Sequence, residues 1–270
     1  MPFTFSHPAA VLPLRRRFKP LQTVPLIIGS VAPDLPYYVP ARVNHFAPLW
    51  YHFTLDTHTL SGALWADVPI GTLALLLVFA FRRPLTALMT PRARALCLQS
   101  VEHFRSQPLH WLFAPFAVLV GTWTHLLWDS FTHDNGFMVR RVAALSAPIT
   151  IGSYTGTLCH VLQYVSSVLG LVILAIWYRR LPTPVVEAPG GNTLSAPART
   201  VLLVLLAVAA TAVGAYRSYQ VAMEGLGTYR VIYVLLVRSI TWFGMLYLTA
   251  GLVVTFMRKR PEPLAETQTR

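Results

Sequence analysis

The residues best suited to chemistry lie in the stretch GTWTHLLWDSFTHDNG, residues 121–136. His125 and Asp129 are four residues apart, so on a helix their side chains project from one face, and His133 follows after another four. Imidazole nitrogens and carboxylate oxygens suit zinc, manganese or iron, so this column could ligate a divalent metal ion. The alternative is an aspartate–histidine pair that satisfies itself near the helix end. Residues 134–136 are typical of the turn that ends a helix.

A second candidate is Asp34, which lies between Pro33 and Pro36 in GSVAPDLPYY. The prolines predict irregular backbone, which is tolerated at membrane depth only where protein or water lines it. A carboxylate held there could be a metal ligand or a general base. Its alternative role is to cap a helix by accepting hydrogen bonds from the amides that follow.

Two further histidines precede helical patterns. His58 lies in DTHTLSG, where Thr57 or Thr59 could cap the next helix, and His7 precedes Pro8 in FTFSHPAAVLP. Proline in a first turn favours a helix that starts near Ser6, which would present His7 at its mouth. Taken singly, both histidines are better explained by a structural role than by catalysis.

The composition indicates which elements must position these residues. Of 270 residues, 54% are hydrophobic and only 12% are charged, about half the charged share of a soluble domain. This excludes a cytosolic enzyme, a disordered chain and a coiled coil, and it predicts an integral membrane protein. The net charge of +12 comes from basic residues at the ends of apolar runs, so it is expected to orient membrane helices rather than to bind nucleic acid. Cys97 and Cys159 cannot form a disulfide framework.

A membrane crossing needs about 20 mostly apolar residues. Four or five runs meet this length, within residues 65–81, 109–131, 159–178, 201–219 and 231–257. A weaker run, residues 21–39, contains Asp34 and three prolines. The sequence therefore predicts an all-α, polytopic membrane helix bundle with five or six transmembrane helices.

The weak run decides the topology. If it crosses, sixteen basic residues share one side of the membrane and five the other; if it does not, the counts are twelve and nine. The six-crossing model fits the positive-inside rule better, but only five crossings bring His7 and Asp34 to the face of His58 and His133. We predict that the first 40 residues form a short helix and a broken or re-entrant segment, with His7 close to Asp34.

The chain divides by composition into three parts. Residues 1–180 carry every histidine, residues 181–200 form a flexible connector, and residues 201–270 form a C-terminal pair of transmembrane helices with a polar tail.

Read in order, the segments SHPAAVLPL, GSVAPD, HTLSG and HLLWDSFTHDNG resemble the domain of unknown function 4184 family of bacterial membrane proteins. The resemblance runs from Met1 to about Trp177 and includes LQYVSSVLGL. The pattern PD, then TH or SH, then HLLxD is also similar to a broader group of inner-membrane metal-dependent hydrolases. More remotely it resembles the zinc-dependent phospholipase C and nuclease group.

The resemblance implies one polar centre, with His133 and Asn135 at its rim. Its members are His7, Asp34, His58, His125 and Asp129. The broader hydrolase group tends to carry HR before its TH pair, whereas His52 and Asp56 stand in the corresponding stretch here. This departure puts binding of a substrate phosphate by an arginine in doubt.

The predicted activity is metal-assisted hydrolysis of a phosphoester or another lipid-linked ester in the bacterial inner (plasma) membrane. The metal would be zinc, with manganese or iron as alternatives, held by His7, His58, His125, Asp129 and His133. Asp34 would be a further ligand or the general base. The competing hypotheses are a non-enzymatic protein, for transport of a metal or small solute or for assembly, and a hydrogen-bonded polar core without metal. If there is one site, Asp34, His58, His125 and Asp129 should converge within about 5 Å.

Overall fold

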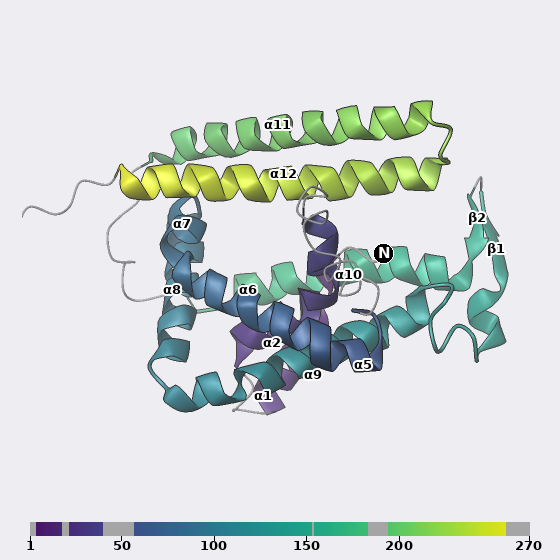
Figure 1. Ribbon diagram of the computed structural model, residues 1–270, viewed down its shortest axis with the longest axis horizontal. Coiled ribbons are helices and arrows are strands. Elements are labelled where there is room, and N and C mark those ends of the chain that lie inside the picture. The colour runs from purple at the N-terminus through teal and green to yellow at the C-terminus, as the bar shows by residue number, and fades with distance from the viewer. Residues whose placement is uncertain (1–3, 18–21, 40–56, 153, 183–193, 258–270) are drawn as a thin grey trace, which may run out of the picture. The chain divides into compact units, whose positions relative to one another are not determined.

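The computed structural model describes residues 4–17, 22–39, 57–152, 154–182 and 194–257 (Figure 1). Within these ranges the chain is almost entirely helical. The elements before the first long loop are η1 (Thr4–Ser6), α1 (Pro8–Arg17), α2 (Thr23–Val31), η2 (Ala32–Tyr38), α5 (Leu60–Gly62), η3 (Ala63–Asp67), α6 (Val68–Ala80), α7 (Arg82–Ala87), α8 (Pro91–Arg105) and α9 (Pro108–Thr132). Those after it are η4 (Ala143–Ser146), β1 (Pro148–Ile151), β2 (Tyr154–Thr157), α10 (Leu158–Arg180), α11 (Ala196–Met223) and α12 (Thr228–Phe256).

Within the described ranges, five helices are long and apolar enough to cross a membrane, which confirms the predicted all-α polytopic bundle. They are Leu60–Ala80, Pro108–Thr132, Leu158–Arg180, Ala196–Met223 and Thr228–Phe256. Each begins one to five residues before the predicted apolar run. Many large apolar side chains on these helices are exposed, as expected for surfaces that face lipid tails.

The weak run of residues 21–39 is not among these five candidate spans. Its helix α2 has only nine residues and passes into η2, a 3₁₀ helix that holds Pro33 and Pro36. Proline lacks the N–H that an α-helix needs and clashes with the preceding turn. The segment is therefore a short helix followed by a tighter one, in line with the predicted broken segment.

The chain forms two compact units. One comprises Met1–Ala80 and Gln99–Thr183, and the other comprises Phe81–Leu98 and Pro184–Arg270. The sequence had assigned everything up to residue 180 to one part, whereas residues 81–98 pack with the C-terminal helix pair. The predicted connector lies mostly outside the described residues.

In the first unit, α2 crosses α9 at close range because glycine stands at both contact points. A Cβ on Gly29 would meet the backbone of Val118, and one on Gly121 would meet the carbonyl of Leu26. Thr122 of α9 also donates a hydrogen bond to the Gly29 carbonyl at 3.2 Å. This crossing sets the distance between the residues at the end of α2 and those on α9.

Apolar clusters flank the crossing on two sides. One joins α2, α6, α9 and the end of α8; its buried members are Ile28, Leu75, Phe79, Val101, Phe104 and Ala114. The other joins α1, α2 and α9 through Val11, Leu26 and Ala117. The N-terminal segment is thus packed onto the helices of its unit.

After α9 the chain forms an antiparallel hairpin, in which Pro148 of β1 pairs with Thr157 of β2 (Figure 1). Gly152 in its turn has a φ of 59°, a conformation that favours glycine. Val139, Leu145 and Cys159 pack together beside the hairpin. This cluster ties the loop to the first turn of α10.

In the second unit, α11 and α12 lie side by side and antiparallel (Figure 1). Gly214 of α11 faces Ser239 of α12, and the Ser218 hydroxyl donates to the Val231 carbonyl at 2.8 Å. Helix α7 packs on α12, where Tyr247 donates to the Leu85 carbonyl at 2.9 Å. Small residues and hydroxyl groups at helix contacts are typical of membrane helix packing.

Candidate metal centre

The first component of the site is Asp34, which lies buried on η2. Its Oδ2 accepts a hydrogen bond from the Thr4 hydroxyl at 2.6 Å, and the Tyr38 hydroxyl lies 2.8 Å from the same Thr4 oxygen. The N-terminal segment therefore holds one carboxylate oxygen, which leaves Oδ1 to face the histidines. The carboxylate does not cap the helix that follows it: the N-cap of η2 is Val31.

The second component is the pair His125 and Asp129, one turn apart on α9 and both buried. The His125 Nδ1 lies 2.8 Å from the Ser30 carbonyl. A carbonyl can only accept, so Nδ1 carries the hydrogen, and the Nε2 lone pair points toward Asp129 and Asp34. Because α2 and α9 cross at close range, the Ser30 carbonyl of α2 fixes the tautomer of His125 on α9.

His58 comes from the segment that enters α5. Thr59 caps this helix by accepting a hydrogen bond from the Gly62 amide at 2.9 Å, which confirms one of the two predicted caps. The Thr57 hydroxyl lies 3.1 Å from Nδ1 of His58. The opposite nitrogen, Nε2, lies 3.3 Å from Oδ1 of Asp34 and 3.7 Å from Oδ2 of Asp129.

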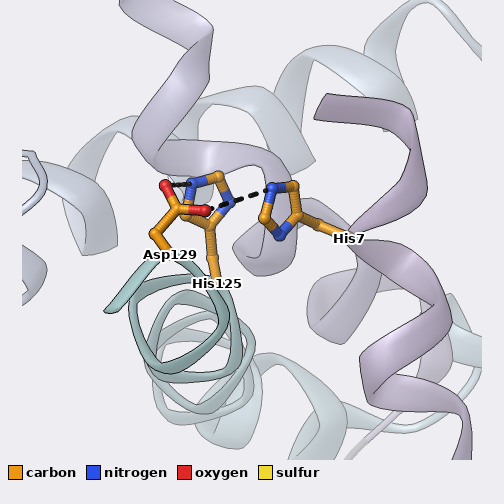
Figure 2. A group of neighbouring side chains, drawn as sticks. All are labelled: His7, His125 and Asp129. Carbon is orange, nitrogen blue, oxygen red and sulfur yellow. Dashed lines mark ion pairs between the residues drawn. The ribbon is translucent and has the colours of Figure 1, made fainter. Parts of the chain in front are cut away.

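His7 lies between η1 and α1, and its imidazole stacks on that of His125 with ring centroids 3.8 Å apart. Its Nε2 is 3.6 Å from Oδ1 of Asp129 (Figure 2). Burial lowers the pKa of His7 to about 3, and the neighbouring His125 adds to this effect. The imidazole is therefore neutral at physiological pH, which is the state that binds metals.

His133 is the C-cap of α9 and has extended backbone. The alignment of His133 with His125 and Asp129 required the helix to continue, and α9 ends at Thr132, so helical spacing does not place His133. Even so, Nδ1 of His133 lies 3.6 Å from Oδ2 of Asp129, because the chain turns back at Gly136, whose amide donates to the His133 carbonyl. Asn135 is exposed, and its carbonyl accepts from Arg140 at 2.6 Å.

Four of these donor atoms form a closed ring. They are Oδ1 of Asp34, Nε2 of His58, Oδ2 of Asp129 and Nε2 of His125. The distances from Asp34 to His58 to Asp129 to His125 and back to Asp34 are 3.3, 3.7, 3.3 and 3.8 Å. Ligands at 2.0–2.1 Å around a tetrahedral zinc ion are about 3.3 Å apart. Each side of the ring is therefore close to the spacing of two ligands on one cation. Three of its members, Asp34, His58 and His125, have donor atoms that all lie within 4.8 Å of one another, and His7, His125 and Asp129 form a second group of this kind.

The hydrogen bonding of these atoms leads to the same interpretation. Within the described part of the chain, Nε2 of His125, Oδ1 of Asp129 and both ring nitrogens of His7 are buried and have no hydrogen-bond partner. Buried polar atoms are rarely left unsatisfied, and each such case requires an explanation. A cation among these atoms would supply such a partner.

The charge state of Asp34 bears on its role. Burial by itself would raise the pKa of this carboxyl, but the imidazoles of His58 and His125 and the Thr4 hydroxyl outweigh burial and hold the pKa below its usual value. A carboxylate that stays ionised so readily is a good metal ligand and a weak base. Of the two roles that the sequence left open, this favours the ligand.

Asp67 was not among the predicted site residues, although an acidic residue inside an apolar run is a recognisable signal. Asp67 ends the π-helical turn η3, which packs on α9 and η2. Both its oxygens are buried, and neither has a hydrogen-bond partner in the part of the chain that the structure describes. Four residues later, Gly71 faces Val118 and Ala32, so Asp67 points into the same interface. There it acts electrostatically on His125 and Asp34.

Of the predicted residues, the structure thus brings together His7, Asp34, His58, His125, Asp129 and His133. Asn135 remains outside this set of contacts. His52 and Asp56 lie outside the described residues.

Comparison with known proteins adds the family. The family model described as Domain of unknown function (DUF4184) matches residues 1–256. The match continues past Trp177 and takes in the C-terminal helix pair. No curated protein and no solved structure matches the chain, so the resemblance to metal-dependent hydrolases stays a prediction.

Proposed function

The chain belongs to the DUF4184 family, and we propose that it is a membrane-embedded, metal-dependent hydrolase that acts on a phosphoester or another lipid-linked ester. The observation that carries the proposal is the ring of four donor atoms with sides of 3.3–3.8 Å. Two imidazoles and two carboxylates match the ligands of zinc, and also those of manganese or iron. When bound, a cation of this kind lowers the pKa of water and polarises an ester oxygen.

The residues of the chain orient the ring through their outer atoms. Ser30 fixes His125, Thr57 contacts His58, and Thr4 fixes Asp34. Such partners hold metal ligands in one orientation, and their loss typically costs 10–100-fold in affinity or activity. His7 contacts the free oxygen of Asp129 and closes one side of the ring.

Access to the ring is through His58. Its side chain is 29% exposed, whereas those of His125, Asp34 and His7 are almost fully buried. An ester that reaches the site would therefore approach over His58. His133, with 31% of its side chain exposed, lies beside Asp129 at the rim.

The position of the ring within the helices supports a lipid-linked substrate. His58 immediately precedes one candidate span, and Asp129 lies three residues before the end of another, so the ring is at one end of both. On the same turns of α9, Leu127, Trp128 and Phe131 are exposed. A surface that faces lipid tails next to a polar centre suits a substrate with a polar head and an apolar tail. We place this multi-pass protein in the bacterial plasma membrane.

The test compares metal content and turnover in detergent-purified protein. We expect the protein to hold a divalent metal, to lose it in the His125→Ala and Asp129→Ala variants, and to hydrolyse a lipid phosphoester until a chelator is added. His103→Ala is the matched control, because His103 is exposed on α8. Metal without turnover across a broad ester panel would favour the transport or assembly hypothesis. If the purified protein holds no metal, the histidines and aspartates form a hydrogen-bonded polar core instead.

A further variant separates the two roles of Asp34. Asp34→Asn should lose metal and activity together if Asp34 is a ligand. If activity falls while the metal is retained, Asp34 is the general base instead.

A further inference from the structure

A second cluster of metal-ligating side chains lies outside the ring, where the loop after α9 meets the first turn of α10. Nε2 of His160 is 3.1 Å from Oδ2 of Asp134, and Sγ of Cys159 is 3.5 Å from Oδ1 of the same carboxylate. One donor atom from each of the three residues lies within 4.8 Å of the other two. No residue of this cluster belongs to the ring.

The donor types are those of a zinc-type site. A thiolate sulfur binds zinc at about 2.3 Å and a carboxylate oxygen at about 2.1 Å, so around a tetrahedral ion the two are about 3.6 Å apart. The observed 3.5 Å between Sγ and Oδ1 agrees with this spacing. Three protein ligands with an open fourth position are typical of zinc sites that exchange or react rather than of closed structural ones.

The fold holds the sulfur in place. Cys159 is fully buried and packs with Val139 and Leu145, and the Leu158 amide donates to the Ala147 carbonyl at 3.1 Å. The Thr157 hydroxyl lies 3.0 Å from Sγ. By contrast, the side chains of His160 and Asp134 are 34% and 62% exposed. The sulfur is thus positioned from inside, while the other two donors leave a path for an ion from solvent.

We propose that Asp134, Cys159 and His160 form a second site, which binds a soft divalent cation of the zinc type with its fourth position open to solvent. The proposal does not depend on hydrolysis at the ring. Because Asp134 directly follows His133, which contacts Asp129 of the ring, the second site lies at the solvent-facing rim of the first.

Cobalt substitution tests the proposal, because a cobalt–thiolate bond gives a near-ultraviolet charge-transfer band and the ring contains no sulfur. Cobalt added to the metal-free, full-length protein in detergent should produce this band. Cys159→Ser should abolish it and lower the bound cobalt by about one equivalent. Cys97→Ser is the matched control and should leave both unchanged.

Two further variants test the proposal even if the Cys159→Ser protein fails to fold. His160→Ala should keep Cys159 yet weaken the cobalt affinity that the band reports by at least about tenfold. Replacing His125 and Asp129 by alanine should remove cobalt from the ring and leave the band. No band in the wild type, or a band that persists in Cys159→Ser, would overturn the proposal and leave Asp134 and His160 as an ion pair.

Discussion

At the scale of single residues, the site depends on groups whose charge is set by their burial. Among the described residues, His7 has no hydrogen-bond partner on either ring nitrogen, and Asp67 has none on either oxygen. An unpaired buried polar group costs about 1–3 kcal/mol, and more if it is charged. The protein therefore holds both groups at the expense of stability, as is common for residues kept for binding or catalysis.

The first prediction at this scale concerns acid stability. Between the ordinary pKa of 6.5 and its lowered value of about 3, His7 binds a proton in the unfolded chain but not in the folded one. The free energy of unfolding must therefore fall as the pH falls through this window. From pH 7 to pH 5, chelator-treated wild type should lose about 2 kcal/mol more than the His7→Gln variant. Melting curves at both pH values would measure this, and parallel losses in the two proteins would contradict it.

The second prediction concerns Asp67. Replacing it by asparagine removes the cost of ionising a buried carboxyl that has no hydrogen-bond partner among the described residues, so we expect the metal-free Asp67→Asn protein to be more stable by about 1 kcal/mol at alkaline pH. A cation in the ring would favour the ionised form of the Asp67 carboxyl beside it, so the same change should weaken metal binding. Glu102→Gln is the control, because Glu102 is exposed and has only a surface pair with Arg105. If Asp67→Asn lowers stability and leaves metal affinity unchanged, the carboxyl has a structural partner instead.

At the scale of elements, the crossing of α2 and α9 positions the ring. The bond from His125 to the Ser30 carbonyl and the bond from Thr122 to the Gly29 carbonyl both span it. Asp34 follows directly in η2, so any change in the separation of α2 and α9 moves Asp34 relative to His125. The two glycines at the crossing thus affect metal binding without touching the metal.

We therefore predict that Gly121→Ala damages the site from a distance. The added methyl would overlap the Leu26 carbonyl and the Ser30 amide, so α2 must retreat at a cost of about 1–3 kcal/mol. Metal affinity should fall with the loss of the His125–Ser30 hydrogen bond. Gly244→Ala on α12 is the matched control, since a Cβ there meets nothing within 4 Å. Melting temperatures and metal titrations of both variants check this. If Gly121→Ala and Gly244→Ala have the same melting temperature and the same metal affinity, the prediction is wrong.

At the scale of the whole molecule, the question is which side of the membrane carries the site. With five spans, the N-terminal segment and the loop after α9 lie on the same side, as do His58 and His133. The opposite side of the membrane then carries twelve basic residues, and the side that carries the site has nine. The positive-inside rule places the richer side in the cytoplasm, so the ring should open to the outer face.

Labelling of single cysteines tests this topology. In a background without Cys97 and Cys159, a membrane-impermeant thiol reagent added to intact cells should label Phe5→Cys and Asn135→Cys but not Glu102→Cys. All three positions are exposed in the structure. Labelling of position 5 from the face opposite to position 135 would restore the six-crossing model.

Sequence alone was enough for the features that depend on local pattern. Apolar runs identify the five spans, because a helix must bring about 20 apolar residues into the hydrocarbon core wherever it lies. The spacing of His125 and Asp129 places them on one face for the same reason. The order of motifs pointed to the family, which the match to residues 1–256 confirms.

Only the tertiary structure determined which residues from different helices and loops lie next to one another. Charge counting favoured six crossings, whereas the packing of α1 and α2 on α9 keeps the N-terminal segment as short helices and brings His7 onto His125. His133 joins the site through a chain reversal, not through helical spacing, and Asp67 gains its place from the partner surface of η3. Cys159 had no recognisable motif, since its neighbours Asp134 and His160 meet it only when the loop folds back. Periodicity reports which face a residue is on, but only packing determines what that face meets.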